Sequence, residues 1–270
     1  AIGNQRNCTM FVKNTDLRVC VVFVVAMYLG FVLASIYNNN SLAVASSKIQ
    51  DVLSYDSMIG AEYFAHVANS LDIVTDKVSD HDYQIMYGQY LLPYYREHRN
   101  MKLLEIGLGC NMKYGPGASI LIWKQLFPEA DLWEAEYDVE CVKKAKEDGM
   151  LEGFHTLTGD QGNVKVLDKW IEASGGNFDV IIDDGGHQNC QIWTSFVKLW
   201  PTVKSGGLYF MEDLHVAQVP HYGQFSSPIC EMGTFVPEKM KSYLDDLVYD
   251  DSTDVKFIFC QKHACVLGKK

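Results

Sequence analysis

The sequence of 270 residues has no excess of basic side chains: 23 Lys and Arg stand against 34 Asp and Glu, for a net charge of −11. A nucleic-acid backbone is therefore excluded as the main partner. The eight cysteines form no CxxC pair and no Cys/His quartet with zinc-finger spacing, so a structural zinc is not expected. Internal repeats and low-complexity tracts are also missing. With 48% hydrophobic residues, we expect one sizeable domain plus an appendage.

The N-terminal region contains nineteen consecutive uncharged residues, Val19–Tyr37. This is close to the about 20 residues that cross a bilayer as a helix. Because Lys13 and Arg18 precede the run, the positive-inside rule predicts a signal anchor with the rest of the chain translocated. Residues 39–41, Asn-Asn-Ser, would then be a glycosylation sequon on the correct side. A cleaved signal peptide is the alternative.

These features predict a single-pass membrane protein of the ER or Golgi. A secreted form after signal cleavage, or a domain that faces the cytosol, remain alternatives. A lumenal domain would need its small-molecule cosubstrate imported, which is an argument for the cytosolic orientation. The predicted organisation is a tail (1–18), a transmembrane helix (19–37), a linker (38–48), an aromatic-rich helical cap or lid (49–100) and a catalytic domain (101–270).

From residue 101 onward, apolar strand patterns alternate with helical patterns. Such alternation predicts a doubly wound, mostly parallel Rossmann-like sheet that helices cover on both faces. The last segment, residues 255–269, predicts an antiparallel hairpin. Expected strands are 101–107, 130–137, 154–160, 178–184 and 206–213; expected helices are 118–127, 139–149, 164–173 and 188–199. Ligands of such sheets bind at the carboxyl ends of the strands.

Glycines follow the first of these strands in the segment LLEIGLGC, at Gly107 and Gly109. Glycine lets the backbone approach a ligand because no Cβ stands in the way. A dinucleotide-binding pattern would require a third glycine where the chain has Met112, and Glu105 would repel a pyrophosphate. The same carboxylate favours a cationic ligand, and S-adenosylmethionine carries both a sulfonium and an ammonium group.

Two further acids close the next strands. Glu136 is placed to accept hydrogen bonds from two ribose hydroxyls, and Asp160, followed by Gln161, is placed to accept from an adenine amino group. Acids at three successive strand ends predict the class I S-adenosylmethionine methyltransferase fold.

Three segments resemble the metal-dependent sugar O-methyltransferases of macrolide biosynthesis, the mycinamicin and macrocin type. They are residues 102–138, FDVIIDDGGHQNCQIWTSF and GGLYFMEDL, within a resemblance that covers roughly residues 75–220. The resemblance implies Mg²⁺ held by Asp184, Glu212 and Asp213, and His187 as the base that deprotonates a sugar hydroxyl. The anchor and most of the chain beyond Val219 are outside it, so macrolide sugars are only a guide to the acceptor.

Physical chemistry supports this assignment independently. A hydroxyl is a weak nucleophile until a cation lowers its pKa and a base removes its proton, and oxygen ligands suit Mg²⁺. Neighbouring strand residues point in opposite directions, so one of the two adjacent acids should face the metal. We expect Asp184 to do so, with Asp183 near the methionine part of the cofactor or supporting the loop.

The predicted function is therefore an S-adenosylmethionine-dependent, Mg²⁺-assisted O-methyltransferase acting on a sugar, glycoside or other small-molecule hydroxyl. One alternative keeps the cofactor and uses His187 without a metal. Another is a non-catalytic, membrane-tethered module of the same fold. The sequence predicts neither the acceptor nor the oligomeric state. Four further histidines are candidates for acceptor contact: His66, His81, His215 and His221.

Overall fold

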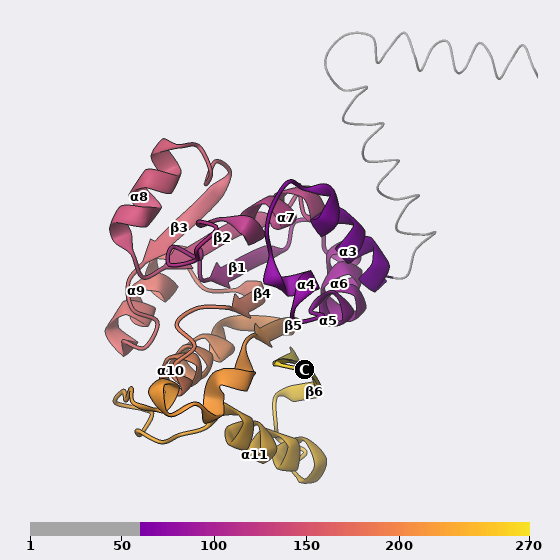
Figure 1. Cartoon of the computed structure of the whole chain (residues 1–270). Helices are drawn as coiled ribbons and strands as arrows, with labels where there is room; N and C mark the ends of the chain where they lie inside the picture. The colour runs from indigo at the N-terminus through magenta and orange to yellow at the C-terminus, as the bar shows by residue number, and fades with distance from the viewer. Residues whose placement is uncertain (1–59) are drawn as a thin grey trace, which may run out of the picture. The chain divides into compact units, whose positions relative to one another are not determined.

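A seven-stranded sheet, in the order β3-β2-β1-β4-β5-β7-β6, runs through the structure (Figure 1). The structure is a computed structural model that describes residues 60–270. The predicted anchor, linker and sequon lie outside the described residues. Among residues 60–270, no helix combines the length and apolar character needed to cross a membrane. The strands are β1 Lys102–Ile106, β2 Asp131–Glu136, β3 Phe154–Thr158, β4 Phe178–Asp183, β5 Val203–Met211, β6 Val255–Gln261 and β7 Ala264–Lys269.

The first five strands pair in parallel, and β7 pairs antiparallel with both β5 and β6. The predicted mostly parallel Rossmann-like sheet is confirmed, and the C-terminal segment forms the expected hairpin. The apolar sequence of β4 is explained by its position, because every residue from Phe178 to Asp183 is buried between the two covered faces.

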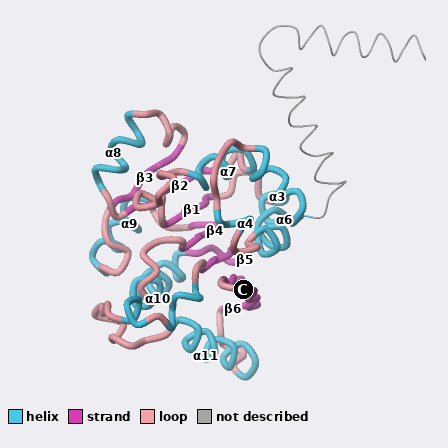
Figure 2. The backbone as a smooth tube through the Cα atoms, in the orientation of Figure 1, coloured by secondary structure: helices cyan, strands magenta, loops and turns pink. Residues whose placement is uncertain are grey.

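Helices cover both faces of the sheet (Figures 1 and 2). One core joins the strands to α9, α10 and α11, with Trp170, Phe196 and Met240 among its buried residues. A second, smaller core lies under α7 and α8 and includes Ile120 and Val142. The helices are α7 Ala118–Leu126, α8 Val139–Glu147, α9 Val164–Ser174, α10 Asn189–Leu199 and α11 Val236–Tyr249, with short 3-10 turns at Trp200–Thr202 (η2), Leu214–Gln218 (η3) and Pro220–Gly223 (η4).

Residues 60–97 are mainly helical and pack beside α7. They comprise α3 Gly60–Ser70, α4 Asp76–Ser79, α5 Gln84–Met86, the π-helical turn η1 Tyr87–Leu91 and α6 Leu92–Glu97. Phe64 and Tyr87 stack on each other at 5.2 Å and both lie against Trp123 of α7. These aromatics therefore bury apolar surface between the cap and the domain. Within the described part of the cap, this packing is one role of the aromatic content seen in the sequence.

Three disulfides join cysteines that the sequence left unassigned: Cys110–Cys141, Cys190–Cys230 and Cys260–Cys265. The first links the loop after β1 to α8, and the second links α10 to the segment before α11. The third closes the turn of the β6–β7 hairpin. Each therefore fixes a loop at the periphery of the sheet.

Candidate active site

The site lies where β1, β4 and β5 end side by side. The register pairs Ile106 of β1 with Asp183 of β4, and Asp183 with Met211 of β5. The next residue on each strand is therefore Gly107, Asp184 or Glu212, and these three stand in a row at one edge of the sheet. Parallel pairing thus brings together acids that are far apart in the sequence.

A cavity of about 490 Å³ opens at this edge. Its lining includes the loop that follows β1 and residues at the ends of β2, β3 and β4. Five of the predicted cofactor-binding residues line it: Gly107, Gly109, Glu136, Asp160 and Gln161. The structure therefore brings these sequence-predicted residues to one surface.

Glu136 and Asp160 are each held by backbone amides. The Glu136 carboxylate accepts hydrogen bonds from the amides of Leu108 and Asp138, both at 3.0 Å. Asp160 Oδ1 accepts from the Gly162 amide at 2.8 Å and from Gln191 Nε2 at 3.0 Å. Because each carboxylate oxygen has two lone pairs, both acids keep acceptor capacity for a ligand.

Gln161 links the cofactor side of the cavity to the loop after β4. Its Oε1 accepts from the Gly186 amide at 2.7 Å, and its Nε2 donates to Asp183 Oδ1 at 2.8 Å. A Cβ at Gly185 would overlap Gln161 Oε1. The first glycine of the DDGGH motif thus leaves room for Gln161, while a Cβ at the second, Gly186, would overlap Gln191 Oε1.

Asp183 and Glu105 are placed differently from the other predicted cofactor residues, because neither belongs to the described lining of the cavity. Asp183 is buried and accepts hydrogen bonds from Ser195, Gln161 and Tyr209. Burial raises the pKa of its carboxyl to about 6. Asp183 and Asp184 point away from each other, as strand geometry requires, and Asp183 supports the loop through Gln161.

Glu105 points into the covered face of the sheet. One of its oxygens accepts from Ser119 Oγ at 2.7 Å and Trp123 Nε1 at 2.8 Å, both on α7. Burial raises the pKa of Glu105, although Lys77 opposes this shift. Its charge therefore acts on the cavity from behind β1.

Asp184, His187 and Asp213 form a compact cluster whose ligand atoms lie within 4.8 Å of one another. His187 Nε2 lies 3.5 Å from Asp184 Oδ1 and 3.4 Å from Asp213 Oδ2. This nitrogen is buried and has no hydrogen-bond partner. Both His187 and Asp213 adopt left-handed backbone angles, with φ of 55° each, a conformation that non-glycine residues seldom adopt outside functional sites and tight turns.

The charges around His187 set its basicity. Burial lowers the pKa of the imidazole, but the close contact and charge of the Asp184 carboxylate, together with Asp213 and Asp183, raise it above its usual value. Burial likewise disfavours ionised Asp184, yet Lys77 and His187 lower the pKa of this carboxyl overall. Asp184 is therefore an anion that stabilises a protonated His187.

Lys77 of α4 is a site residue that the sequence analysis missed. Its ammonium is buried and lies 2.6 Å from Asp184 Oδ2, 2.5 Å from Glu212 Oε2 and 3.7 Å from Glu105 Oε1. Burial lowers the pKa of Lys77, but the three carboxylates raise it well above the usual value. In the segment TDKVSD nothing distinguishes this lysine from a surface lysine, so no sequence signal could have found it.

Two tyrosines of the cap also reach the acids. Tyr83 donates its hydroxyl to Asp213 Oδ1 at 2.6 Å and accepts from the Asp213 amide at 2.9 Å. The Tyr87 hydroxyl donates to Glu212 Oε1. Burial raises the pKa of Glu212 to about 7, against the opposing effect of Lys77. The cap aromatics therefore have a polar role beside their packing role.

The residues present fit both groups that the sequence implied. Glycine backbone with an acid at the end of β2 suits the adenosyl part of S-adenosylmethionine. Asp184 and Asp213 offer carboxylate oxygens to Mg²⁺, beside the unpartnered nitrogen of His187. Glu212, the third predicted ligand, is held by Lys77 and Tyr87 instead. Each Glu212 oxygen keeps a lone pair beside these contacts, as Asp184 Oδ2 does beside Lys77.

The fold is that of class I S-adenosylmethionine-dependent methyltransferases. Among solved structures, the chain is similar to the MycE methyltransferase from the mycinamycin biosynthetic pathway in complex with Mg, SAH and mycinamycin VI. The TM-score is 0.55 and the identity 28%, over 68% of this chain and 48% of that one.

The similarity of the chain to curated proteins agrees with the resemblance that the motifs indicated. The chain is 34% identical over 162 residues to mycinamicin VI 2''-O-methyltransferase of Micromonospora griseorubida, covering 58% of this chain and 38% of the relative. It is 37% identical over 139 residues to demethylmacrocin O-methyltransferase of Streptomyces fradiae, covering 50% and 33%. The chain thus spans less than two fifths of the length of these relatives. No family model matches it. The predicted similarity to sugar O-methyltransferases is confirmed.

The close contact between the ends of β1 and β4 gives a test of this architecture. Gly107 has φ of 115°, and a Cβ there would overlap the Asp184 carbonyl oxygen. Gly107→Ala should lower the free energy of unfolding by about 2–5 kcal/mol, from overpacking and backbone strain together. Gly115→Ala is the matched control, because Gly115 also has a positive φ but open space around it. Its loss should be only about 1–2 kcal/mol. Equal losses in urea titrations of the two variants would contradict the proposed contact.

Proposed function

We propose that this chain is an S-adenosylmethionine-dependent, Mg²⁺-assisted O-methyltransferase that acts on a hydroxyl of a glycoside or related small molecule. The observation that carries the proposal is the buried His187 Nε2, which makes no hydrogen bond but lies in ion-pair contact with Asp184 and Asp213 at the edge of the cavity. A base in this position can take a proton while two carboxylates stabilise the imidazolium that forms.

Each residue of the site has a distinct role in this proposal. His187 accepts the hydroxyl proton on Nε2. Asp184 and Asp213 orient the ring and offer oxygen atoms to a divalent cation. Tyr83 holds Asp213, and Lys77 holds Asp184. When bound, S-adenosylmethionine supplies the methyl group, and Mg²⁺ lowers the pKa of a coordinated hydroxyl.

A sugar hydroxyl is the favoured acceptor because several relatives carry such acceptors in their names. Besides the macrolide enzymes, they include an L-olivosyl-oleandolide 3-O-methyltransferase of Streptomyces antibioticus and two enzymes of Streptomyces olivaceus for rhamnosyl-tetracenomycin compounds. A vicinal diol would also offer two oxygens to one octahedral cation.

His187→Ala should reduce turnover at least about 100-fold, the usual contribution of a general base, while the affinity for S-adenosylmethionine stays within about twofold. Turnover is measured with an isotopically labelled methyl donor and a panel of glycosides, and affinity by calorimetry. His155→Ala, an exposed histidine on β3, is the matched control and should behave as the unmodified chain. Loss of cofactor binding in His187→Ala would contradict the assignment of a base.

Removal of divalent cations separates metal-assisted from metal-independent catalysis. Activity should be lost in EDTA and return on addition of Mg²⁺, because the hydroxyl then regains its cation. The metal-independent alternative draws on a specific observation, since the Lys77 ammonium already forms ion pairs with both Asp184 and Glu212. Full activity in EDTA, together with its loss in Lys77→Met, would favour that alternative.

We further propose that residues 19–37 anchor the chain in an endomembrane, with the catalytic domain in the lumen. The uncharged run and its basic flank support this orientation. The three disulfides add support, because disulfides persist in oxidising compartments.

In secretory cells, the chain should carry a glycan that Asn39→Gln removes, seen as a mobility shift after glycosidase treatment. Peptide mapping without reductant should recover the three cysteine pairs. An unglycosylated chain whose six paired cysteines are all free thiols would instead place the domain in the cytosol.

A further inference from the structure

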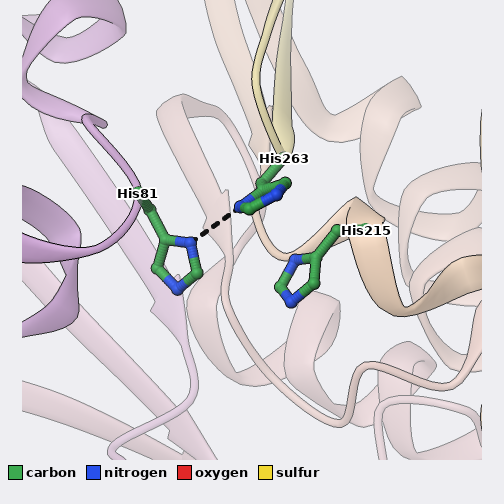
Figure 3. A group of neighbouring side chains, drawn as sticks. All are labelled: His81, His215 and His263. Atoms are coloured by element: carbon green, nitrogen blue, oxygen red, sulfur yellow. Dashed lines mark hydrogen bonds between the residues drawn. The ribbon is translucent and has the colours of Figure 1, made fainter.

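Three histidines from separate parts of the chain meet beside the candidate active site (Figure 3). His81 follows α4, His215 lies in η3, and His263 lies in the turn between β6 and β7. One nitrogen from each ring can be chosen so that all three lie within 4.8 Å of one another. The His215 and His263 ring centres are 4.1 Å apart, and the His81 and His263 centres 5.1 Å.

His81 contacts both a second ring and two carboxylates. Its Nδ1 shares a hydrogen bond of 2.9 Å with His263 Nδ1, so a metal ion bound to both nitrogens would displace the proton between them. Its Nε2 faces two carboxylates, Asp213 Oδ1 at 3.6 Å and Asp76 Oδ2 at 3.9 Å. A carboxylate that attracts the Nε2 proton leaves the lone pair on Nδ1, which then points toward the other rings. Metal-bound histidines are commonly oriented by a carboxylate in this way.

Hydrogen bonds outside the rings hold the three segments in place. The Leu214 amide donates to the His263 carbonyl at 2.7 Å. Gln261 Nε2 donates to the carbonyls of His81 at 3.3 Å and Asp82 at 2.9 Å. The Cys260–Cys265 disulfide closes the hairpin turn that carries His263. The backbone is therefore preorganised, and side-chain rotation alone can bring the nitrogens to one ion.

We propose that His81, His215 and His263 bind one zinc-class divalent ion at a site separate from the Asp184–His187–Asp213 cluster. Three imidazoles without carboxylate ligands suit Zn²⁺ rather than Mg²⁺, and leave a fourth position for water. Nitrogens around tetrahedral zinc are about 3.3 Å apart, as follows from Zn–N bonds of about 2.0–2.1 Å. His215 is exposed, so it can rotate to close the remaining gap.

Such an ion would join three segments that already meet through ring contacts, an ion pair and hydrogen bonds. It ties the cap segment that follows Lys77 to η3, which follows Asp213, and to the C-terminal hairpin. No sequence motif marks this site, because its ligands at positions 81, 215 and 263 are 134 and 48 residues apart along the chain, with none of the short spacings of zinc motifs.

The test uses the full chain without a histidine tag, stripped of metals and then saturated with Mg²⁺. Zn²⁺ is titrated in competition with a chromophoric chelator, and Co²⁺ absorption reports the nitrogen ligands. We expect one tight equivalent of Zn²⁺, and a fall in affinity of more than about 100-fold in His263→Ala and in His215→Ala. His155→Ala and His187→Ala should keep the affinity of the unmodified chain.

Thermal unfolding gives a second readout. Zn²⁺ should raise the melting temperature of the unmodified chain, since it binds only the folded state, and should leave that of His215→Ala unchanged. His215 is exposed, so this variant keeps its fold, as its melting temperature without zinc will confirm. Zinc affinity that survives in both histidine variants, or that is lost in His187→Ala instead, would overturn the proposal, as would the absence of zinc binding.

Discussion

The site depends on the ion pairs that the buried ammonium of Lys77 forms with the neighbouring carboxylates. Asp184 and Glu212 end neighbouring parallel strands, and Glu105 lies behind them, so their negative charges gather where little water reaches. Ionised groups are expensive to bury unless an opposite charge compensates them. Lys77 supplies this charge, and it does so from α4, outside the sheet. Removing one partner of such a buried group typically destabilises a protein by about 3–5 kcal/mol. The cap and the catalytic edge therefore form one electrostatic unit.

The acids of the site differ in the partners that orient them. Asp184 lies between two cationic partners, Lys77 and His187, while Asp213 lies between Tyr83 and His187. Asp184 and Asp213 are thus oriented by their surroundings before any ligand enters, which is the condition for electrostatic preorganisation. Glu212, by contrast, is bound on both of its oxygens by residues of the cap, Lys77 and Tyr87.

Most of the sheet and much of the site could be predicted from sequence. The apolar strands, the glycines after β1 and the acids at strand ends follow from local patterns, and parallel pairing then brings Gly107, Asp184 and Asp213 to one edge. Lys77, Tyr83 and the His81–His215–His263 cluster could not be predicted. Their contacts depend on how the cap and the hairpin pack against the sheet, and their local sequences are those of ordinary surface segments. Helix α11 was missed because its segment contains no motif that marks a function.

Lys77 binds carboxylates that are far from it in sequence, and this separation has a consequence for folding during synthesis. The two carboxylates to which it donates hydrogen bonds lie 107 and 135 residues further along the sequence. During synthesis from the N-terminus, α4 therefore emerges long before β4 and β5 exist, and its lysine stays in water through that interval. Contacts of such long sequence separation form late, since they require closure of large loops. The charged centre therefore cannot form until β5 and the Glu212 that follows it have been synthesised.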